Sequence, residues 1–258
     1  MEASAASIAK RARREAHNLW SAFASSLYLM KPGDVVAYLD MCTREGSSLQ
    51  RGMNFHLSPS HSVVLMSVRP GAPYNDEVTD AGRTLIYEGH DEPRSTEVPD
   101  PKAVDQPILA PKGALTQNGL FYRAAEAFRN GEGPPERVRV YEKVRQGIWV
   151  YTGLFHLLDA WFQDDGTRKV CKFKLSLVDQ EEDDAPAPIS PDHTRVIPTD
   201  VKLEVWRRDR GRCTKCGSEN NLHFDHIIPY SKGGSSLVAD NVQLLCARHN
   251  LQKRDRLE

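Results

Sequence analysis

Two pairs of closely spaced metal-binding residues near the C-terminus constrain this chain more than any other feature. Cys213 and Cys216 form the first pair, and Cys246 and His249 repeat the same spacing thirty residues later. Thiolates and an imidazole in this arrangement are typical ligands of tetrahedral Zn²⁺. Because protein side chains fill all four positions, the predicted zinc is structural, since a catalytic zinc keeps one position open. The competing interpretation, three buried cysteines and a surface histidine, does not explain why both pairs are present.

The cysteine count and the composition limit where such a chain works. It has five cysteines among 258 residues, and an odd number argues against a disulfide framework and for a reducing compartment. With 40% hydrophobic and 27% charged residues, it has the composition of an ordinary globular protein. No apolar run approaches the roughly 20 residues of a membrane-spanning helix, and the first residues lack the apolar core of a signal peptide. We therefore expect a cytoplasmic protein with no membrane partner.

The charges are segregated, although 34 Lys and Arg nearly balance 35 Asp and Glu. Residues 179–192 carry six acidic and no basic residues, whereas residues 199–258 carry eleven basic and eight acidic residues. Local basic patches can bind nucleic acid even when the net charge is near zero. The charge pattern alone is equally compatible with an ordinary solvated surface.

Changes in sequence pattern divide the chain into four segments. Apolar residues at helical spacing predict a helix within residues 1–30. Residues 179–198 are acidic and proline-rich, cannot bury apolar surface, and predict a flexible linker. Two domains flank that linker, a larger one over residues 31–178 and a smaller one over residues 199–258. The smaller domain is short enough to need a metal for its stability.

The larger domain carries many short β-type runs separated by turn residues. They begin with residues 35–39, and one helical pattern over residues 119–130 interrupts them. Many short strands with few helices predict a curved sheet or barrel, not alternating βαβ units. The predicted fold class is therefore α+β, a β-rich N-terminal domain with helices followed by a small zinc-stabilised domain.

The segment between the two ligand pairs carries three further motifs. They are Leu222-His-Phe-Asp225-His226-Ile-Ile-Pro229, Lys232-Gly-Gly234 and Asp240-Asn241-Val-Gln-Leu-Leu-Cys246. Together with the ligand pairs, they resemble the HNH nuclease motif over nearly all of residues 203–255. This resemblance implies a ββα fold that surrounds one catalytic divalent ion.

The HNH resemblance also implies a role for each polar residue of the motif. His226 matches the general base that activates water, and Asn241 matches the residue that orients the loop and the catalytic histidine. Asp225 and Asn250 match the ligands of the catalytic ion, while His249 remains a zinc ligand. The chemistry agrees, because a histidine titrates near neutrality and a hard cation such as Mg²⁺ or Mn²⁺ prefers oxygen ligands.

Other polar residues near this motif are candidates for contacts with the phosphate backbone. His223 lies two residues before Asp225, on the same face of the predicted strand, and is either a phosphate contact or a bystander. Several basic residues bracket the motif and are candidate phosphate contacts, although none of them can be singled out: Arg207, Arg208, Arg210, Arg212, Lys253, Arg254 and Arg256.

A second set of motifs runs through the larger domain in a fixed order. It comprises Tyr74-Asn-Asp-Glu-Val78, Gly82, Leu85-Ile-Tyr87-Glu-Gly89, Asp105-Gln106, Asn118, Val138-Arg-Val140, Tyr151-Thr-Gly153, Trp161 and Phe173-Lys-Leu175. In this order the motifs resemble the SRA (YDG) domain, which flips 5-methylcytosine out of a DNA duplex.

The SRA resemblance implies a pocket for the flipped base. Tyr74 and Tyr87 would sandwich the base, and either Asp76 or Glu77 would accept a hydrogen bond from its exocyclic amine. Glu77 is nearest the family position, where many members have Asp. Glu88 stands where the family often has Thr, and it either alters the tolerance of 5-hydroxymethylcytosine or faces solvent.

One polar loop is a candidate to enter the DNA groove. Residues 43–56 lie where the family carries such a loop, and Arg44, Gln50, Arg51 and Asn54 are candidates to fill the space left by the flipped base. An ordinary surface loop is an equal alternative.

The two resemblances together predict a member of the SRA-HNH family of modification-dependent restriction endonucleases, which are bacterial enzymes. Its partner would be double-stranded DNA that contains 5-methylcytosine, with 5-hydroxymethylcytosine as an open alternative. Because one HNH site cuts one strand, we expect a homodimer, and the flexible linker suggests cleavage at a variable distance from the base. Two other functions remain open, a non-cleaving reader of modified DNA and an HNH nuclease without modification dependence.

Overall fold

The computed structural model describes residues 30–178, 196–229 and 232–253. The predicted N-terminal helix lies outside these ranges except for Met30, and so does the predicted linker except for residues 196–198. Among the described residues, no helix is long and apolar enough to cross a membrane.

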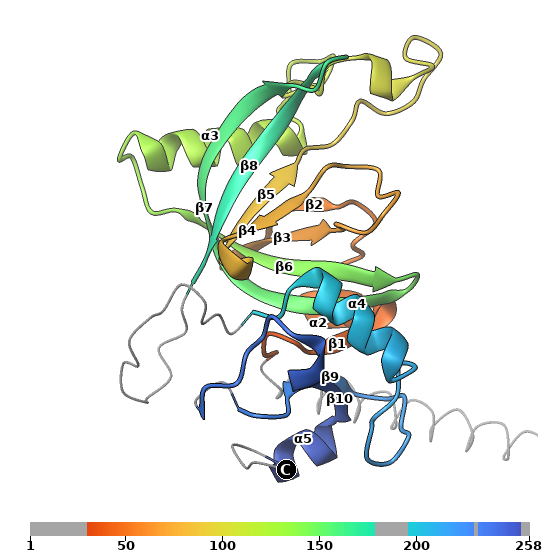
Figure 1. Cartoon of the computed structure of the whole chain (residues 1–258). Helices are drawn as coiled ribbons and strands as arrows, with labels where there is room; N and C mark the ends of the chain where they lie inside the picture. Colours follow the sequence, from red (N-terminus) through yellow and green to blue (C-terminus); the bar gives the residue numbers. More distant parts are fainter. Residues whose placement is uncertain (1–29, 179–195, 230–231, 254–258) are drawn as a thin grey trace, which may run out of the picture.

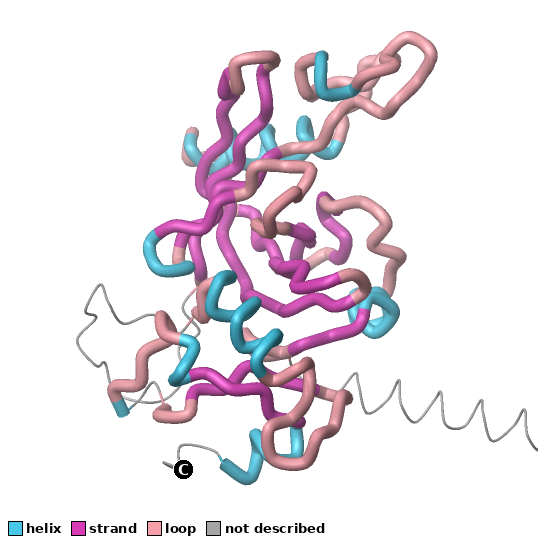
Figure 2. The backbone as a smooth tube through the Cα atoms, turned by 45° about the vertical axis from the view of Figure 1, so that its right-hand side comes forward, coloured by secondary structure: helices cyan, strands magenta, loops and turns pink. Residues whose placement is uncertain are grey.

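One eight-stranded sheet forms the body of the N-terminal domain and curves strongly (Figure 1, Figure 2). Its order is β2-β3-β6-β7-β8-β5-β4, and β1 pairs with β7. All pairs are antiparallel except β3 with β6, which is parallel. The strands are β1 (Val35–Ala37), β2 (Met53–Ser58), β3 (His61–Met66), β4 (Glu77–Thr79), β5 (Thr84–Glu88), β6 (Glu136–Arg145), β7 (Ile148–Asp164) and β8 (Lys169–Leu177).

Two α-helices and two 3₁₀ turns complete this domain. The helical pattern predicted over residues 119–130 corresponds to α3, which begins where the Thr116 hydroxyl accepts a hydrogen bond from Gly119 N–H. The strand predicted over residues 35–39 is wrong in its second half, because β1 ends at Ala37 and a helix follows. The elements are α2 (Tyr38–Glu45), η1 (Asp80–Gly82), η2 (Pro101–Ala103) and α3 (Gln117–Arg129).

The main core lies between the sheet and α3. Phe121 and Ala125 project from α3 into this core, since residues four apart lie on one face of a helix. Alternate residues of the long strands meet them, because successive side chains of a strand point to opposite faces. The strand residues of the core include Val138, Val140, Phe155, Leu157, Phe173 and Leu175.

The C-terminal domain is a two-stranded hairpin flanked by helices. β9 and β10 pair antiparallel, with Phe224 opposite Leu244, and α5 follows β10 without a break. The ββα order and the α+β class predicted from the sequence are therefore confirmed. Its elements are α4 (Thr199–Arg208), β9 (Leu222–His226), η4 (Ala239–Asn241), β10 (Val242–Cys246) and α5 (Ala247–Lys253).

The two domains are in contact. The helix α4 lies beside β6, and β9 lies beside β1 (Figure 1). Val196 and Ile197, which the sequence placed in the linker, are both buried. Ile197 joins the apolar core of the C-terminal domain, so the buried structure begins before the predicted boundary at residue 199.

Candidate functional site

Four ligand atoms form a cluster in the C-terminal domain. The cysteine sulfurs and a ring nitrogen of Cys213, Cys216, Cys246 and His249 all lie within 4.8 Å of one another. The Cys216 and Cys246 sulfurs are 3.9 Å apart, and His249 Nδ1 lies 3.4 Å from the Cys213 sulfur and 3.3 Å from the Cys246 sulfur. Zinc–sulfur bonds of about 2.3 Å place tetrahedral ligands roughly 3.5–3.8 Å apart. The four residues therefore fit a structural zinc ion.

The local backbone prepares this cluster for a cation. Cys213 and Cys216 flank a turn in which Gly217 N–H donates to the carbonyl of Cys213, and Cys246 ends β10 immediately before α5. Burial opposes ionisation of Cys213, but N–H groups of Cys246, Lys215 and Cys216 donate to its sulfur and lower the pKa of the thiol to about 6. A thiolate, the form that binds zinc, is thus favoured there.

The predicted catalytic residues gather around the end of β9. Asp225 and His226 are its last two residues, opposite Gln243 and Val242 of β10. His226 Nε2 lies 2.7 Å from the Ser236 hydroxyl oxygen, which orients the imidazole. The chain then turns back toward β10 through residues 227–241, of which residues 230–231 lie outside the described part.

Asn241 braces that returning loop. Its side-chain oxygen accepts a hydrogen bond from Ile228 N–H at 2.8 Å, and its amide nitrogen donates to the carbonyls of Ile228 and Ser235 at 3.2 and 2.9 Å. Gly234 lets the two ends of this loop lie close together, because a Cβ at residue 234 would lie only 1.8 Å from the Ile228 carbonyl oxygen. These contacts agree with the loop-orienting role that the HNH resemblance implies for Asn241.

The helix α5 brings the Lys253 side chain to β9. The Lys253 ammonium lies 2.9 Å from Asp225 Oδ2 and donates to the His226 carbonyl at 2.5 Å. Asn250 precedes Lys253 by three residues, so the two share one face of the helix. The Asp225 carboxylate thus already pairs with the Lys253 ammonium. The side-chain oxygens of Asp225 and Asn250 are of the type that a hard divalent ion prefers.

Three of the candidate phosphate contacts interact with other parts of the protein. Lys253 is buried, with a side chain only 1% exposed. It contacts β9, which carries Asp225 and His226 and is called the catalytic strand below. Arg208 donates to the carbonyls of Ala239 and Val242. His223 is buried, and its Nδ1 lies 2.5 Å from Asp34 Oδ1 in the N-terminal domain. Arg254 and Arg256 lie outside the described residues.

A cavity of about 770 Å³ opens in the N-terminal domain beside β5. Tyr74, Asp76 and Tyr87 line it, whereas Glu77 is exposed on β4 and does not. Gln50 and Arg51, two of the candidate groove residues, line it as well. Of the two candidate carboxylates, the structure therefore places Asp76 in the cavity.

The Asp76 carboxylate is fixed by two backbone groups. Its oxygens accept hydrogen bonds from Ser67 N–H and Glu88 N–H, each at 3.0 Å. Burial outweighs these two hydrogen bonds and raises the pKa of Asp76 to about 6. The Asp76 side chain is therefore held in one orientation in the cavity, and it changes between the neutral acid and the carboxylate slightly below neutral pH.

The sequence did not point to His90, which also lines this cavity. Its ring stacks on Tyr74 with the ring centroids 5.7 Å apart and an angle of 22° between the planes, and its Nε2 lies 3.4 Å from the Tyr87 hydroxyl oxygen. Burial lowers the pKa of His90 to about 4, so the ring is neutral at pH 7. Gly52 admits both rings, because a Cβ there would lie 2.7 Å from the Tyr87 hydroxyl and 2.8 Å from His90 Nε2.

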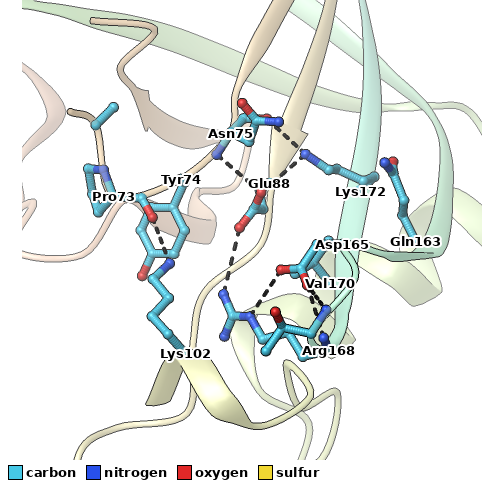
Figure 3. Close-up of a pocket in the computed structure, with 12 residues that line it drawn as sticks. Pro73, Tyr74, Asn75, Glu88, Lys102, Gln163, Asp165, Arg168, Val170 and Lys172 are labelled. Atoms are coloured by element: carbon cyan, nitrogen blue, oxygen red, sulfur yellow. Dashed lines mark hydrogen bonds and ion pairs between the residues drawn. The ribbon is translucent and has the colours of Figure 1, made fainter. Parts of the chain in front are cut away.

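Tyr74 also lines a smaller cavity of about 400 Å³ (Figure 3). Glu88 points into it and is buried, not solvent-facing. Its carboxylate lies 3.1 Å from the Lys172 ammonium and accepts a hydrogen bond from Asn75 N–H at 3.1 Å. Lys172 also donates to the Asn75 carbonyl. The pair therefore holds the segment that carries Tyr74 and Asp76.

Comparison with protein families bears on the C-terminal domain. Residues 213–256 match the family described as HNH endonuclease. This match confirms the HNH prediction, and the chain thus carries a nuclease domain. No curated protein matches the chain.

Several solved structures are similar to the chain. One is the SRA domain of SUVH5 in complex with hemimethylated CG DNA, at 22% identity, 61% coverage of this chain, 94% of that chain and a TM-score of 0.40. Another is the DNA modification-dependent restriction endonuclease AspBHI, at 16% identity, 60% and 79% coverage and a TM-score of 0.42. A third is Arabidopsis thaliana SUVH6 in complex with SAM, at 17% identity, 77% and 32% coverage and a TM-score of 0.40.

Proposed function

We propose that the protein is a modification-dependent DNA endonuclease. Its N-terminal cavity would take a 5-methylcytosine flipped out of duplex DNA, and its HNH domain would hydrolyse a nearby phosphodiester bond. One observation carries this proposal: the domain that holds Asp225 and His226 packs on a β-domain whose cavity combines aromatic rings with the buried carboxylate of Asp76.

The cavity has the chemistry that a cytosine requires. A flipped base needs flat apolar walls, which Tyr74 and Tyr87 can provide. Cytosine presents an amine donor where thymine presents a carbonyl acceptor, so an ionised Asp76 would accept from the first and repel the second. Because Ser67 N–H and Glu88 N–H already hold this carboxylate, it is oriented before the base arrives. A 5-hydroxymethylcytosine keeps the same amine and is the second candidate base.

The nuclease site has the parts needed for hydrolysis of a phosphodiester. Asp225 and Asn250 would hold a Mg²⁺ or Mn²⁺ ion, which when bound would neutralise charge on the phosphate and stabilise the leaving oxygen. Ser236 orients His226 through Nε2, and the second ring nitrogen, Nδ1, would take the proton from the attacking water. Lys253 holds the backbone of His226 and the carboxylate of Asp225 on one ammonium group.

A double-strand break would need two such sites. One HNH site cuts one strand, so the working form we propose is a two-fold homodimer in the cytoplasm of a bacterium. Sedimentation with a modified duplex would detect the dimer.

Cleavage of matched plasmids tests the proposal directly. With Mg²⁺ or Mn²⁺, a plasmid carrying 5-methylcytosine should be linearised and its unmodified copy should stay supercoiled. Tyr74→Ala and Tyr87→Ala should abolish this preference, whereas Tyr122→Ala on α3, away from the cavity, should retain it. A reader without nuclease activity would leave both plasmids intact, and a nuclease without modification dependence would cut both equally.

A further inference from the structure

An apolar core is shared between the two domains. From the N-terminal domain, called the sheet domain below, it contains Val144 of β6 and Val150 of β7. From the C-terminal domain it contains Val201 and Val205 of α4 and Phe224 of β9. All five side chains are buried. Burial of apolar surface is non-directional and favours close packing of the two domains, but it does not by itself select one orientation.

A buried ion pair and a buried hydrogen bond cross the same interface, and because both are directional they favour one orientation of the two domains. The Lys202 ammonium on α4 lies 2.7 Å from the Glu142 carboxylate on β6, and each side chain is only 3% exposed. His223 Nδ1 on β9 lies 2.5 Å from Asp34 Oδ1, with side chains 7% and 9% exposed. A buried charged or polar partner left alone is costly, so both pairs are satisfied only when the domains keep this arrangement.

The catalytic strand is also joined to the sheet through its backbone. Phe224 N–H donates to the Gly33 carbonyl at 3.1 Å, and Asp34 forms a β-bridge with His223. Gly33 and Asp34 are in turn hydrogen-bonded to Tyr151 of β7. Gly33 has φ of +98°, and a Cβ there would lie 3.0 Å from the Phe224 carbonyl oxygen, so glycine permits this close approach.

We infer that the base pocket and the nuclease site form one rigid unit, in which Asp34 and Glu142 of the sheet domain are positioning residues for the catalytic strand. Asp225 directly follows Phe224, so the contacts of His223 and Phe224 with the sheet domain determine where the nuclease site lies relative to the pocket. This inference rests on the proposed function and makes it more specific: cleavage falls at a fixed distance from the modified base.

If the two domains were instead joined only by a flexible segment, the distribution of cut sites would be measurably different. If the seventeen residues 179–195 were the sole connection, a chain of that length would let the nuclease domain sample roughly 20–25 Å. At about 3.4 Å per base pair, that corresponds to cuts spread over about seven positions.

Mapping of cut sites on a duplex with one 5-methylcytosine distinguishes the two. We expect the wild-type protein to cut each strand at one phosphodiester or its immediate neighbour. The double variant Asp34→Asn, Glu142→Gln should spread its cuts over about seven base pairs. The charge-matched control Asp40→Asn, Glu204→Gln, at two exposed positions, should keep the narrow pattern. A broad wild-type pattern, or a narrow one in the double variant, would overturn the inference.

Hydrogen exchange tests the interface without DNA. The Phe224 amide donates to Gly33 across the interface, so it should be protected in the wild-type protein and lose protection in the double variant. Amides of Leu244 and Leu245 on β10, together with a full zinc content, should show that the nuclease domain of the variant is folded. Unprotected Phe224 in the wild-type protein would refute rigid docking. If the wild-type protein protects the Phe224 amide but shows no modification-dependent cleavage, the proposed function is refuted and the rigid docking stands.

Discussion

The nuclease site and the base pocket are built in opposite ways. All described residues of the nuclease site and zinc cluster lie within residues 213–253 and are carried by one turn, one hairpin with its connecting loop, and one short helix. The cavity is lined by residues from Tyr38 to Trp149, brought together by a sheet of eight strands. A short hairpin buries little apolar surface and depends on a metal, whereas a large sheet with its own core does not. The base pocket should therefore form independently of zinc, whereas the nuclease site should not.

Removal of zinc is the largest change we predict. Cys246→Ser, or chelation of the wild-type protein, should abolish cleavage, because metal binding supplies much of the folding free energy of small zinc domains. Binding of methylated duplex should survive, since no zinc ligand lies in the sheet domain. Zinc content, plasmid cleavage and a gel shift measure the three quantities. Cys42→Ser, in the sheet domain, is the matched control and should retain zinc and cleavage.

Loss of methylated-DNA binding together with zinc would contradict the independence of the base pocket from zinc. It would mean that the sheet domain needs the C-terminal domain to keep its cavity, with the shared apolar core as the route.

The second change separates catalysis from base recognition. His226→Ala should reduce the cleavage rate by about 10²–10⁴, the usual contribution of a general base, and leave the affinity for methylated duplex unchanged. His156→Ala on β7 of the sheet domain is the matched control. Single-turnover cleavage and equilibrium binding provide the two numbers. A rate within a fewfold of wild type would assign the proton to another group.

The contrast between the two sites also explains what could be predicted from the sequence. One short stretch of the sequence contains the zinc ligands, Asp225, His226 and Asn241. Their order and spacing therefore already predict that they lie close together. The burial of Lys253 was not predictable, because an exposed and a buried lysine near a helix end look alike in sequence. The contact between His223 and Asp34 joins residues 189 positions apart, and no local pattern reports such a pair.

The pocket was predictable only in outline. Tyr74 and Tyr87 followed from a family resemblance, but the choice between Asp76 and Glu77 did not. Neighbouring residues at a strand edge point in opposite directions, and here the direction is determined by the hydrogen bonds from Ser67 and Glu88 to Asp76. His90 enters the cavity because β5 ends beside Tyr74, which is a property of the fold.

A third change tests which carboxylate reads the base. Asp76→Asn should reduce the preference for 5-methylcytosine over thymine roughly 5-fold to 100-fold, because one good base-specific contact is worth about 1–3 kcal/mol. Glu77→Gln is the adjacent control and should keep the wild-type preference, since Glu77 is exposed outside the cavity. Competition binding with duplexes that differ only at this base pair gives the ratio. The opposite pattern, with only Glu77→Gln losing the preference, would move the contact to Glu77.

The smallest effect we predict is a pH dependence confined to the pocket. Burial raises the pKa of Asp76 from near 3.8 to about 6, so the fold favours the neutral acid. The stability contributed by this group is thus fully present below pH 3.8 and is lost as pH rises through about 6. Recognition has the opposite sign, because the ionised carboxylate accepts the amine hydrogen more strongly than the neutral acid does. Between pH 7 and 5 the ionised fraction falls about tenfold, and the preference for 5-methylcytosine over thymine should fall with it.

The Asp76→Asn variant provides the control for this pH dependence, since its preference should be low and flat over the same range. Both duplexes carry the same phosphates, so changes in general DNA affinity cancel in the ratio. His90 does not interfere, because its pKa of about 4 keeps it neutral above pH 5. A wild-type preference that stays constant from pH 5 to 8 would show that the ionised Asp76 does not contact the base, and the pocket would then have to distinguish cytosine from thymine by shape alone.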